Sequence, residues 1–320
     1  LNLNELSYLN NGGGVSPLSG AGNGIDLGDG DDRINVTTDR TGLTVTDSQV
    51  SLSDVTPLGI VDVQGVAGEE LNVVGGGADT SFDLSGWTGA ATVNGGGGTD
   101  ELSLATRGTD STWNLTDVDT GSVGTINYDL VEQLIGGTGN DTFVVSGAVA
   151  NLTSIDGGTG GTNTIDLRSA GAAQAVTLTG LGANVGFAGD AAGVIDSFDN
   201  IIDVQAPAGV GDSLTGADLA ATWTINATSG TYSSGGRTLN YSGMDAFNGG
   251  TDDDTFNVNA NRVAGINGGD GNDSVTIAAN VTLTGNVDLG DGTNTLALNS
   301  NSQLTGTATG GADADTLNHA

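Results

Sequence analysis

Residues 268–275 read GGDGNDSV, and variants of this octapeptide recur along the chain. Two further stretches match the pattern G-G-x-G-x-D-x-apolar in full, residues 95–102 (GGGGTDEL) and 136–143 (GGTGNDTF). Glycine admits the backbone conformations of tight turns, and aspartate bonds to the backbone of its own turn. The octapeptide therefore predicts a turn that leads into a strand. Close variants stand at residues 27–34, 249–256, 289–296 and 310–317.

These turns recur at a nearly fixed period. The sixth residue of the pattern falls at positions 254, 273, 294 and 315, which are 19, 21 and 21 residues apart. Earlier in the chain, Asp79, Asp100 and Asp141 are spaced by 21 and 41 residues, or one and two periods. A fixed period of this length is typical of stacked repeats. Residues 35–74 and 166–210 follow it less clearly, so longer or irregular coils are expected there.

Between the turns, apolar residues alternate with Thr, Asn and Asp, which predicts half-buried strands and no helix. We therefore predict an all-β chain that forms a parallel β-solenoid of the β-helix or β-roll type, with coils of about 20–21 residues. One Gly/Asp turn per coil predicts that these turns stack on one edge. Residues 1–24 are predicted to be an N-terminal cap or joining segment, and residues 25–320 a single elongated solenoid.

A larger duplication overlies the short repeat. Trp113-Asn-Leu resembles Trp223-Thr-Ile, and the residues that follow each tryptophan correspond over a long block. The duplicated blocks extend over about residues 113–165 and 223–277. The architecture is therefore expected to have duplicated in groups of several coils.

The composition excludes several classes of partner. The 320 residues include 39 acidic and six basic side chains, all six of them Arg, and the net charge is −33. A nucleic-acid-binding protein needs a basic surface, so no nucleic-acid partner is expected. No apolar run is long enough to span a bilayer, so membrane insertion is not expected either. Adaptation to high salt is an alternative explanation of the acidity.

The octapeptide resembles the glycine-rich nonapeptide of repeats-in-toxin (RTX) proteins. In that family, the turns of successive coils hold Ca²⁺ between them, through the Asp carboxylate and main-chain carbonyls. The resemblance therefore implies Ca²⁺ as the cofactor, and Ca²⁺ takes six to eight oxygen ligands. The family's nonapeptides run in tandem, whereas this chain has one copy per 19–22 residues. This departure predicts one row of sites instead of two.

The candidate calcium ligands follow from the pattern. Asn294 offers a carbonyl oxygen without a charge, so its site is expected to be weaker. Asp29 neighbours Asp32 in a terminal site, and the third-position residues Asp270 and Asp291 are expected to contribute main-chain carbonyls. The alternative for each aspartate is a turn in which its side chain only caps the local backbone. The sixth-position candidates are Asp32, Asp100, Asp141, Asp254, Asp273, Asn294 and Asp315.

These features predict a non-catalytic, calcium-stabilised structural repeat of a bacterial cell surface or extracellular matrix, secreted from the cell. Exposed end coils predict self-association into fibres. One alternative is an adhesin that binds glycans or host surfaces through a patch built by Trp87 or by residues 166–210. Trp87, Trp113 and Trp223 could form a sugar-stacking platform, but the duplication favours a structural role for Trp113 and Trp223. Another alternative is a surface-layer lattice protein. Catalysis is not expected, because the chain has no Cys or Lys, and its single histidine, His319, is assigned no role.

Overall fold

The computed structural model describes residues 70–146, 154–209 and 211–320, together with the backbone of five strands between residues 24 and 64. These residues form 35 strands and no helix, which confirms the predicted all-β class. The described part of the chain accordingly contains no helix suited to crossing a membrane. Residues 1–23 of the predicted N-terminal cap lie outside the described residues, as do the candidate ligands Asp29 and Asp32.

The chain divides into two compact units, and each is described by itself. Unit 1 contains most of the residues up to Gly161, and unit 2 contains most of those from Thr162 onward. Strands belong to two large sheets, here called sheet A and sheet B, and unit 2 also has a small sheet C. Neighbouring strands within sheets A and B are parallel or antiparallel, so both sheets are mixed.

In unit 1, sheet A has the order β2 (Arg33–Thr37), β6 (Glu70–Val74), β8 (Ala90–Asn94), β12 (Ile126–Asp129), β11 (Thr120–Val123), β10 (Thr112–Asp117) and β14 (Thr142–Ser146), of which only the first two residues of β14 belong to unit 1. Sheet B has the order β1 (Gly24–Asp26), β5 (Ile60–Gln64), β4 (Gln49–Leu52), β3 (Gly42–Thr46), β7 (Ser81–Gly86), β9 (Glu101–Ser103), β13 (Gln133–Ile135) and β15 (Ser154–Asp156).

In unit 2, sheet A has the order β16 (Thr164–Ser169), β20 (Asp203–Gln205), β24 (Arg237–Ser242), β23 (Ser229–Ser234), β22 (Ala221–Ile225), β26 (Asp254–Val258), β29 (Ser274–Ile277), β32 (Thr295–Leu298) and β35 (Thr316–His319). Sheet B has the order β19 (Ile195–Ile201), β18 (Phe187–Ala191), β17 (Ala175–Leu181), β21 (Ser213–Thr215), β25 (Ala246–Gly250), β28 (Gly265–Gly269), β31 (Val287–Asp288) and β34 (Ala308–Thr309). Sheet C consists of β27 (Arg262–Val263), β30 (Thr282–Thr284) and β33 (Gln303–Leu304).

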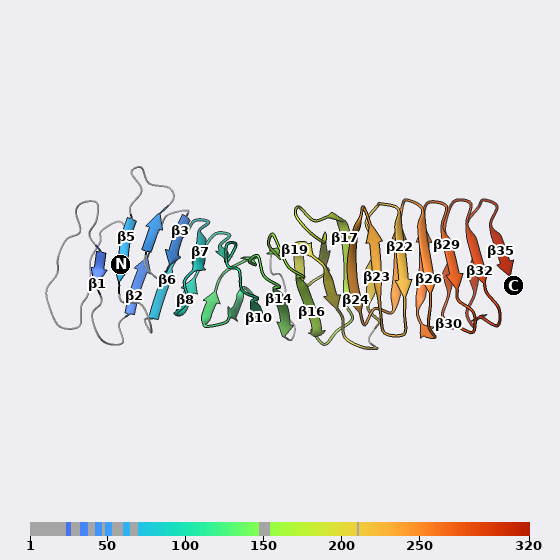
Figure 1. Ribbon diagram of the computed structural model, residues 1–320, viewed down its shortest axis with the longest axis horizontal. Coiled ribbons are helices and arrows are strands. Elements are labelled where there is room, and N and C mark those ends of the chain that lie inside the picture. The colour runs from blue at the N-terminus through green and yellow to red at the C-terminus, as the bar shows by residue number, and fades with distance from the viewer. Residues whose placement is uncertain are drawn as a thin grey trace. The chain divides into compact units, whose positions relative to one another are not determined.

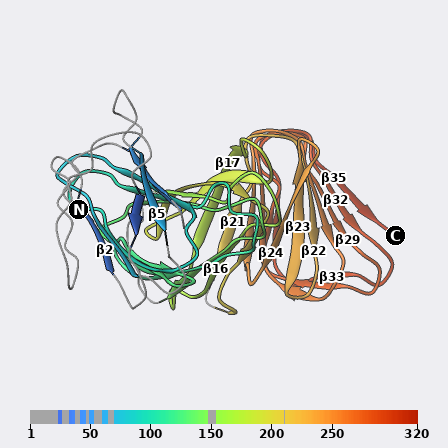
Figure 2. The ribbon, with the colours of Figure 1, turned by 60° about the vertical axis from the view of Figure 1, so that its left-hand side comes forward.

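The last part of unit 2 is the most regular. From β25 to β35 the chain passes repeatedly from sheet B to sheet A, through a short strand of sheet C, and back to sheet B. The sheet A strands β22, β26, β29, β32 and β35 lie side by side (Figures 1 and 2). Their parallel pairing sets Phe256 against Val275, Val275 against Leu296, and Leu296 against Leu317. The spacings of 19, 21 and 21 residues found in the sequence therefore equal the offsets between paired residues in sheet A.

The Gly/Asp turns do not all lead the same way. The turns that end at Asp254, Asp273 and Asn294 lead from sheet B into sheet A, as does the turn that ends at Asp141. The turn at residues 95–100, by contrast, leads from sheet A into sheet B. The turn that ends at Asp212 in unit 2 also leads from sheet A into sheet B, so the prediction of a single edge is wrong in both units. The chain needs a sharp turn whenever it passes from one sheet to the other. Gly/Asp turns therefore occur both where it passes from sheet A to sheet B and where it passes from sheet B to sheet A.

Four times in the described residues, the chain makes three successive antiparallel strands in one sheet before it crosses to the other. In unit 1 these triplets are β3–β5 in sheet B and β10–β12 in sheet A. In unit 2 they are β17–β19 in sheet B and β22–β24 in sheet A. The triplets in sheet B fall in the two stretches where the sequence period was unclear. Each unit therefore has one triplet in sheet A and one triplet in sheet B.

The two sheets share an aromatic core, and it reproduces the larger duplication. Trp113 stacks on Phe143 with ring centroids 5.6 Å apart and planes at 14°, and Trp223 stacks on Phe256 at 5.3 Å and 14°. Each tryptophan also contacts a tyrosine, Tyr128 or Tyr241 respectively, at nearly the same tilt. Trp87, Trp113 and Trp223 are at most 1% exposed. They build the core, so the sugar-stacking platform is not formed.

Candidate metal-binding turns

The sixth-position side chains link one repeat to the previous one, and those of Asp273 and Asn294 are buried. Asp273 Oδ1 accepts the backbone N–H of Asp254 at 2.8 Å, and Asn294 Oδ1 accepts that of Asp273 at 2.7 Å. Asp315 Oδ1 accepts the N–H of Asn294 at 3.0 Å. We call this series the inner ladder. Because each rung joins a side chain to the backbone of the neighbouring repeat, the ladder holds successive turns in register.

The inner ladder also occurs at the other turns. In unit 1, Asp100 Oδ1 accepts the N–H of Thr80 at 2.7 Å, and Asp141 Oδ1 accepts that of Ser111 at 2.9 Å. In unit 2, Asp212 Oδ1 accepts the N–H of Gln174 at 2.6 Å. All of these side chains are buried. The Gly/Asp pattern is therefore a stacking device as well as a turn.

The second carboxylate oxygen explains the paired glycines. In two turns it bonds within its own turn, Asp141 Oδ2 to Gly137 N at 2.6 Å and Asp254 Oδ2 to Gly250 N at 3.1 Å. A Cβ atom on the first glycine would collide with this oxygen, as it would at Gly268 with Asp273 Oδ2. The second glycine, Gly269, has a φ of +102°, which side chains rarely adopt. The bare backbone thus makes room for the folded-back carboxylate.

Replacing Gly268 by Ala is expected to destabilise unit 2 by about 1–2 kcal/mol, because the added Cβ would overlap both Asp273 Oδ2 and the carbonyl oxygen of Leu289. Gly265→Ala is the matched control: it lies on the same strand, and a Cβ there would meet nothing within 4 Å. Urea denaturation of both variants measures the difference. Equal loss in the two variants would contradict the close fit of carboxylate and glycine.

A second set of hydrogen bonds runs along the outside of the turns, from the fifth position. Asp253 Oδ1 accepts the N–H of Asn272 at 2.7 Å, and Asn272 Oδ1 accepts that of Thr293 at 3.0 Å. In unit 1, Asp110 Oδ1 accepts the N–H of Asn140 at 2.8 Å. This outer ladder links each repeat to the next one, in the opposite sense to the inner ladder. Side-chain hydrogen bonds therefore join each turn both to the repeat before it and to the repeat after it.

Burial makes the inner-ladder carboxylates costly to ionise. Desolvation raises the pKa of Asp254 to about 7, and the nearby charge of Asp273 adds to the shift. Desolvation likewise raises the pKa of Asp100 and of Asp273 to about 6, and it raises the pKa of Asp141 and Asp212. One oxygen each of Asp100, Asp212 and Asp273 is buried without a hydrogen-bond partner. These oxygens favour a proton or a bound cation.

Three of the described arginines are engaged with the backbone. Arg237 donates to the carbonyls of Gly182 and Gly186, and Arg262 donates to those of Asn226 and Met244. Arg107 donates to the carbonyls of Leu84 and Trp87. These arginines therefore hold main-chain segments together. None of these hydrogen bonds goes to an inner-ladder carboxylate.

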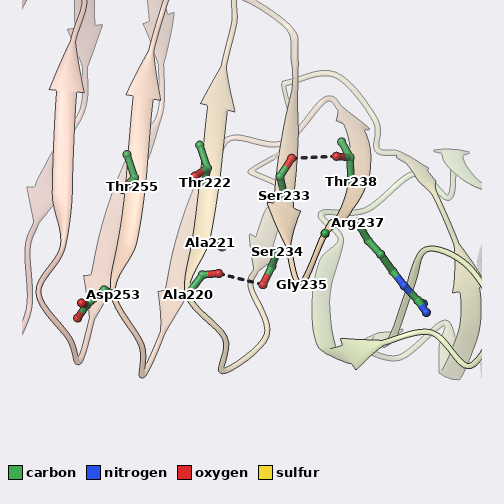
Figure 3. A pocket seen from close by; sticks show the side chains of 11 residues that line it. Ala220, Ala221, Thr222, Ser233, Ser234, Gly235, Arg237, Thr238, Asp253 and Thr255 are labelled. Atoms are coloured by element: carbon green, nitrogen blue, oxygen red, sulfur yellow. Dashed lines mark hydrogen bonds between the residues drawn. The ribbon is translucent and has the colours of Figure 1, made fainter.

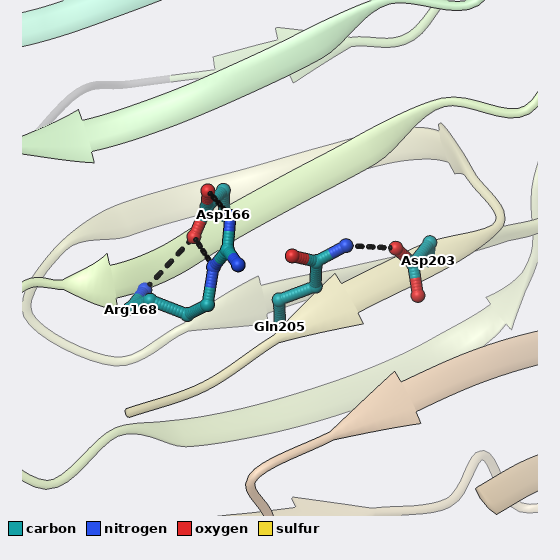
Figure 4. Close-up of polar contacts among 4 residues, drawn as sticks. All are labelled: Asp166, Arg168, Asp203 and Gln205. Atoms are coloured by element: carbon teal, nitrogen blue, oxygen red, sulfur yellow. Dashed lines mark hydrogen bonds and ion pairs between the residues drawn. The ribbon is translucent and has the colours of Figure 1, made fainter. Parts of the chain in front are cut away.

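Arg168 forms an ion pair with Asp166 on strand β16 at 2.6 Å (Figure 4). This pair lowers the pKa of Asp166. On the neighbouring strand β20, Gln205 Nε2 donates to Asp203 at 2.6 Å. Both contacts lie on the strands, away from the Gly/Asp turns, so the inner-ladder aspartates have a different electrostatic setting.

The structure sorts the predicted site residues into three groups. Asp100, Asp141, Asp254, Asp273 and Asn294 lie buried in the inner ladder. Asp315 makes the same bond but is exposed. Asp270 and Asp291 are exposed and pair as an isolated parallel bridge on the surface of neighbouring turns.

The sequence pattern missed several residues of the ladder. Thr80 occupies the sixth position that was assigned to Asp79, whose carboxylate instead accepts the N–H of Thr99 in the outer ladder. Ser111 and Gln174 occupy the same position in other turns. A signal was present, because each stands two residues before an inward-facing apolar residue, as Thr80 stands before Phe82.

The geometry partly fits a metal site. Among the described residues, no three acidic or histidine side chains converge to form a site by themselves. A cation at these turns would therefore need main-chain carbonyls as well, and Ca²⁺ commonly uses such ligands. The unpartnered carboxylate oxygens supply the negative charge. The residues are thus chemically suited to Ca²⁺, with the backbone as the necessary second source of ligands.

One shallow hollow lies on the outer face of sheet A (Figure 3). It has a volume of about 600 Å³ and lies over β22, the β23–β24 hairpin and β26. Ser233 and Thr238 share a hydrogen bond of 3.0 Å there, and Thr222 and Thr255 lie beside them. No aromatic side chain lines this hollow. It therefore lacks the flat ring that would stack on a sugar.

No family model matches this chain, and no curated protein or solved structure matches it either.

Proposed function

We propose that this chain is a non-catalytic structural repeat protein, a parallel β-solenoid whose stacked turns are stabilised by Ca²⁺. The inner ladder is the observation that carries the proposal. Its buried side chains connect repeat to repeat, and they are used for stacking instead of facing a substrate. The passage from sheet A through sheet C to sheet B and back supports the solenoid path.

The calcium part of the proposal rests on charge. Asp254 and Asp273 are buried neighbours, the charge of Asp273 helps to raise the pKa of Asp254, and Asp273 Oδ2 has no hydrogen-bond partner. Burying two like charges is unfavourable unless a proton or a cation compensates them. A hard divalent cation satisfies both the charge and the oxygen ligands. Because the stacked turns exist only in the folded chain, binding of Ca²⁺ would stabilise the fold.

Calcium is therefore expected to raise the unfolding free energy at neutral pH. A site saturated to 100 times its dissociation constant contributes about 2.7 kcal/mol. Guanidinium denaturation in millimolar Ca²⁺ and in EGTA measures this gain, with Mg²⁺ as a control for ionic strength and charge. An Asp254→Asn, Asp273→Asn double variant should lose part of the gain. Identical denaturation midpoints in Ca²⁺ and EGTA would contradict the calcium proposal and leave the structural role in place.

The proposed setting is a bacterial cell surface or extracellular matrix, reached by secretion. Extracellular calcium is plentiful, and a chain with a net charge of −33 repels itself until cations neutralise it. We include self-association through the end repeats in the proposal, because strand edges are natural pairing surfaces. The glycan-binding alternative has less support, because the three tryptophans are buried and the polar hollow has no aromatic lining.

A further inference from the structure

A pocket of about 480 Å³ lies in unit 2, at the edge where three parallel strands of sheet A end. Strands β16, β20 and β24 lie side by side, so the residues at their ends meet at one edge of the sheet. The lining includes Arg168 from β16, residues 206–209 after β20, and Ser242, Gly243 and Asp245 around the end of β24. The pocket is therefore built by the ends of neighbouring strands.

The opposite wall is the first strand of sheet C. Strand β27 pairs with β30, and in the described residues no strand pairs with its other edge. Both residues of β27, Arg262 and Val263, line the pocket, together with Ala227 and Thr228 from the turn between β22 and β23. Val263 is 72% exposed. Sheet C thus begins at the pocket, and the small residues around it leave the space open.

Arg262 brings a buried positive charge to the pocket wall. The residue is 8% exposed, and its Nη1 and Nη2 atoms donate to the carbonyl oxygens of Asn226 and Met244. Its Nε atom is buried without a hydrogen-bond partner. In the part of the chain that the structure describes, Arg262 has no hydrogen bond or ion pair with a carboxylate. A buried charge without a bonded counter-charge is unfavourable, so this wall favours an anion.

Arg168 supplies a second guanidinium group. Its Nε and Nη2 atoms donate to Asp166 at 2.9 and 2.6 Å, so this ion pair leaves Nη1 unused (Figure 4). The side chain is 62% exposed and is therefore accessible to a ligand. Unit 2 contains three arginines, and two of them, Arg168 and Arg262, line this pocket. In a chain with 39 acidic and six basic residues, the pocket is a local concentration of positive charge.

The rest of the lining suits a ligand with hydroxyl groups. Asp245 Oδ2 accepts the N–H of Gly211 at 2.9 Å, and a carboxylate can accept several further hydrogen bonds. Thr228 and Ser242 add hydroxyl groups of their own, and Val263 adds an apolar surface. A bare inorganic anion would meet Asp245 as a like charge. A molecule that carries both a carboxylate and hydroxyl groups has a favourable partner for each of these side chains.

We propose that this pocket binds a sugar acid, a ring that carries one carboxylate and several hydroxyl groups. Arg168 and Arg262 bind the carboxylate, and Asp245, Thr228 and Ser242 bind the hydroxyl groups. Hydrogen bonds from arginine to a carboxylate are stronger than those between neutral groups. The volume of the pocket lies within the range of small-molecule sites, about 300–1,000 Å³. Because recognition uses charge and hydrogen bonds, it needs no aromatic ring, and it does not involve the calcium sites of the proposed function.

The test measures binding of D-glucuronate to the full chain by isothermal titration calorimetry, in millimolar Ca²⁺ at pH 7.4. D-glucose lacks the carboxylate, and acetate lacks the hydroxyl groups. Glucuronate is expected to bind at least about tenfold more tightly than either, the usual effect of one charge-assisted hydrogen bond or of several neutral ones. Absence of glucuronate binding, or equal binding of glucose or acetate, would overturn the inference. Free glycine is a further probe, because its ammonium group would suit Asp245, and equal binding of glycine would overturn the choice of a sugar acid.

Arg168→Gln and Ala227→Leu test where the ligand binds. The first variant removes a positive charge from an exposed side chain, and the second fills part of the pocket without changing its charge. Each is expected to weaken glucuronate binding by about tenfold or more. Circular dichroism checks that both variants keep the fold. Unchanged affinity in either variant would place the ligand elsewhere and refute the inference.

Arg237→Gln is the matched control, because it removes the same charge from unit 2 at a residue that does not line this pocket. It should bind glucuronate as tightly as the unaltered chain. A loss equal to that of Arg168→Gln would indicate a general charge effect and count against the pocket. Failure of this inference leaves the proposed structural role and its calcium sites in place, because neither uses these residues.

Discussion

Replacing Asp273 by Asn is expected to stabilise the metal-free chain at neutral pH, whereas replacing it by Ala should not. Asparagine keeps the oxygen that accepts the N–H of Asp254, and it removes a buried charge. Asn294 shows how an amide fits this position, since its Nδ2 donates to the carbonyls of Gly290 and Gly292 at 3.0 and 3.2 Å. Alanine instead leaves the buried N–H of Asp254 unpaired, which costs about 1–3 kcal/mol.

The measurement is urea denaturation in EGTA at pH 7.5, and the informative quantity is the difference between the two variants. Asp273→Asn should exceed Asp273→Ala in stability by about 1–3 kcal/mol, the cost of the unpaired N–H. Asp270→Asn and Asp270→Ala provide the control pair, because Asp270 is exposed on the same turn. Equal stability of the two Asp273 variants would show that the inner ladder contributes little.

The metal-free chain should lose stability as the pH rises from about 4 to about 7. The folded-state pKa is about 6 for Asp100 and Asp273 and about 7 for Asp254, and the ordinary value is 3.8. The folded chain therefore binds more protons than the unfolded chain between these values, so its stability is greatest below the ordinary pKa and falls through the raised ones. A shift of about two pKa units, as at Asp100 and Asp273, corresponds to a loss of up to about 3 kcal/mol per group.

Two aspartates have lowered pKa values, so their effect on stability changes with pH in the opposite direction. Hydrogen bonds from Asn140 lower the pKa of Asp110, and Arg168 lowers that of Asp166. Their contributions are present above the ordinary pKa and disappear as the pH falls below it. The stability of the metal-free chain should therefore be greatest near pH 4.

Denaturation in EGTA across pH 4–8 measures this profile. The Asp254→Asn, Asp273→Asn double variant should flatten it, while the exposed pair Asp270→Asn, Asp291→Asn should change it little. Millimolar Ca²⁺ should oppose the loss at neutral pH, because a bound cation replaces the protons. A profile that rises from pH 5 to pH 7.5 in EGTA would contradict the raised pKa values.

The period, and the parallel direction of the strands that follow it, could be predicted from the sequence because they depend on spacing; the antiparallel triplets make both sheets mixed, so the prediction of parallel strands throughout is wrong. The interval from Asp254 to Asp273 became the register between β26 and β29, and the interval from Asp273 to Asn294 became that between β29 and β32. Alternating apolar residues correctly predicted the buried face of strands such as β26 and β29. These features are local, or they repeat at one fixed offset, so they are visible in a single chain.

Other features depend on position and not on residue type. At the sixth position of turns without Asp, Thr80, Ser111 and Gln174 supply the backbone N–H that the inner ladder uses. Their buried side chains bond instead to a carbonyl of their own turn. A pattern built on aspartate passes over them, and it placed Asp79 one residue out of register. The three-strand triplets were also hidden, because a hairpin inserted between two repeats appears in the sequence only as a lengthened interval.

The pairing of triplets sets how such a chain can grow by gene duplication. Each triplet adds two strands to one sheet, or about 10 Å of its width. A copy that carried only β22–β24 would lengthen sheet A by that amount and leave sheet B short, so the two buried faces would no longer cover each other. A copy that carries one triplet of each sheet keeps both flush. This constraint favours inheritance in long segments, and it accounts for an offset of 110 residues between Trp113 and Trp223 in a chain whose repeat is about 20.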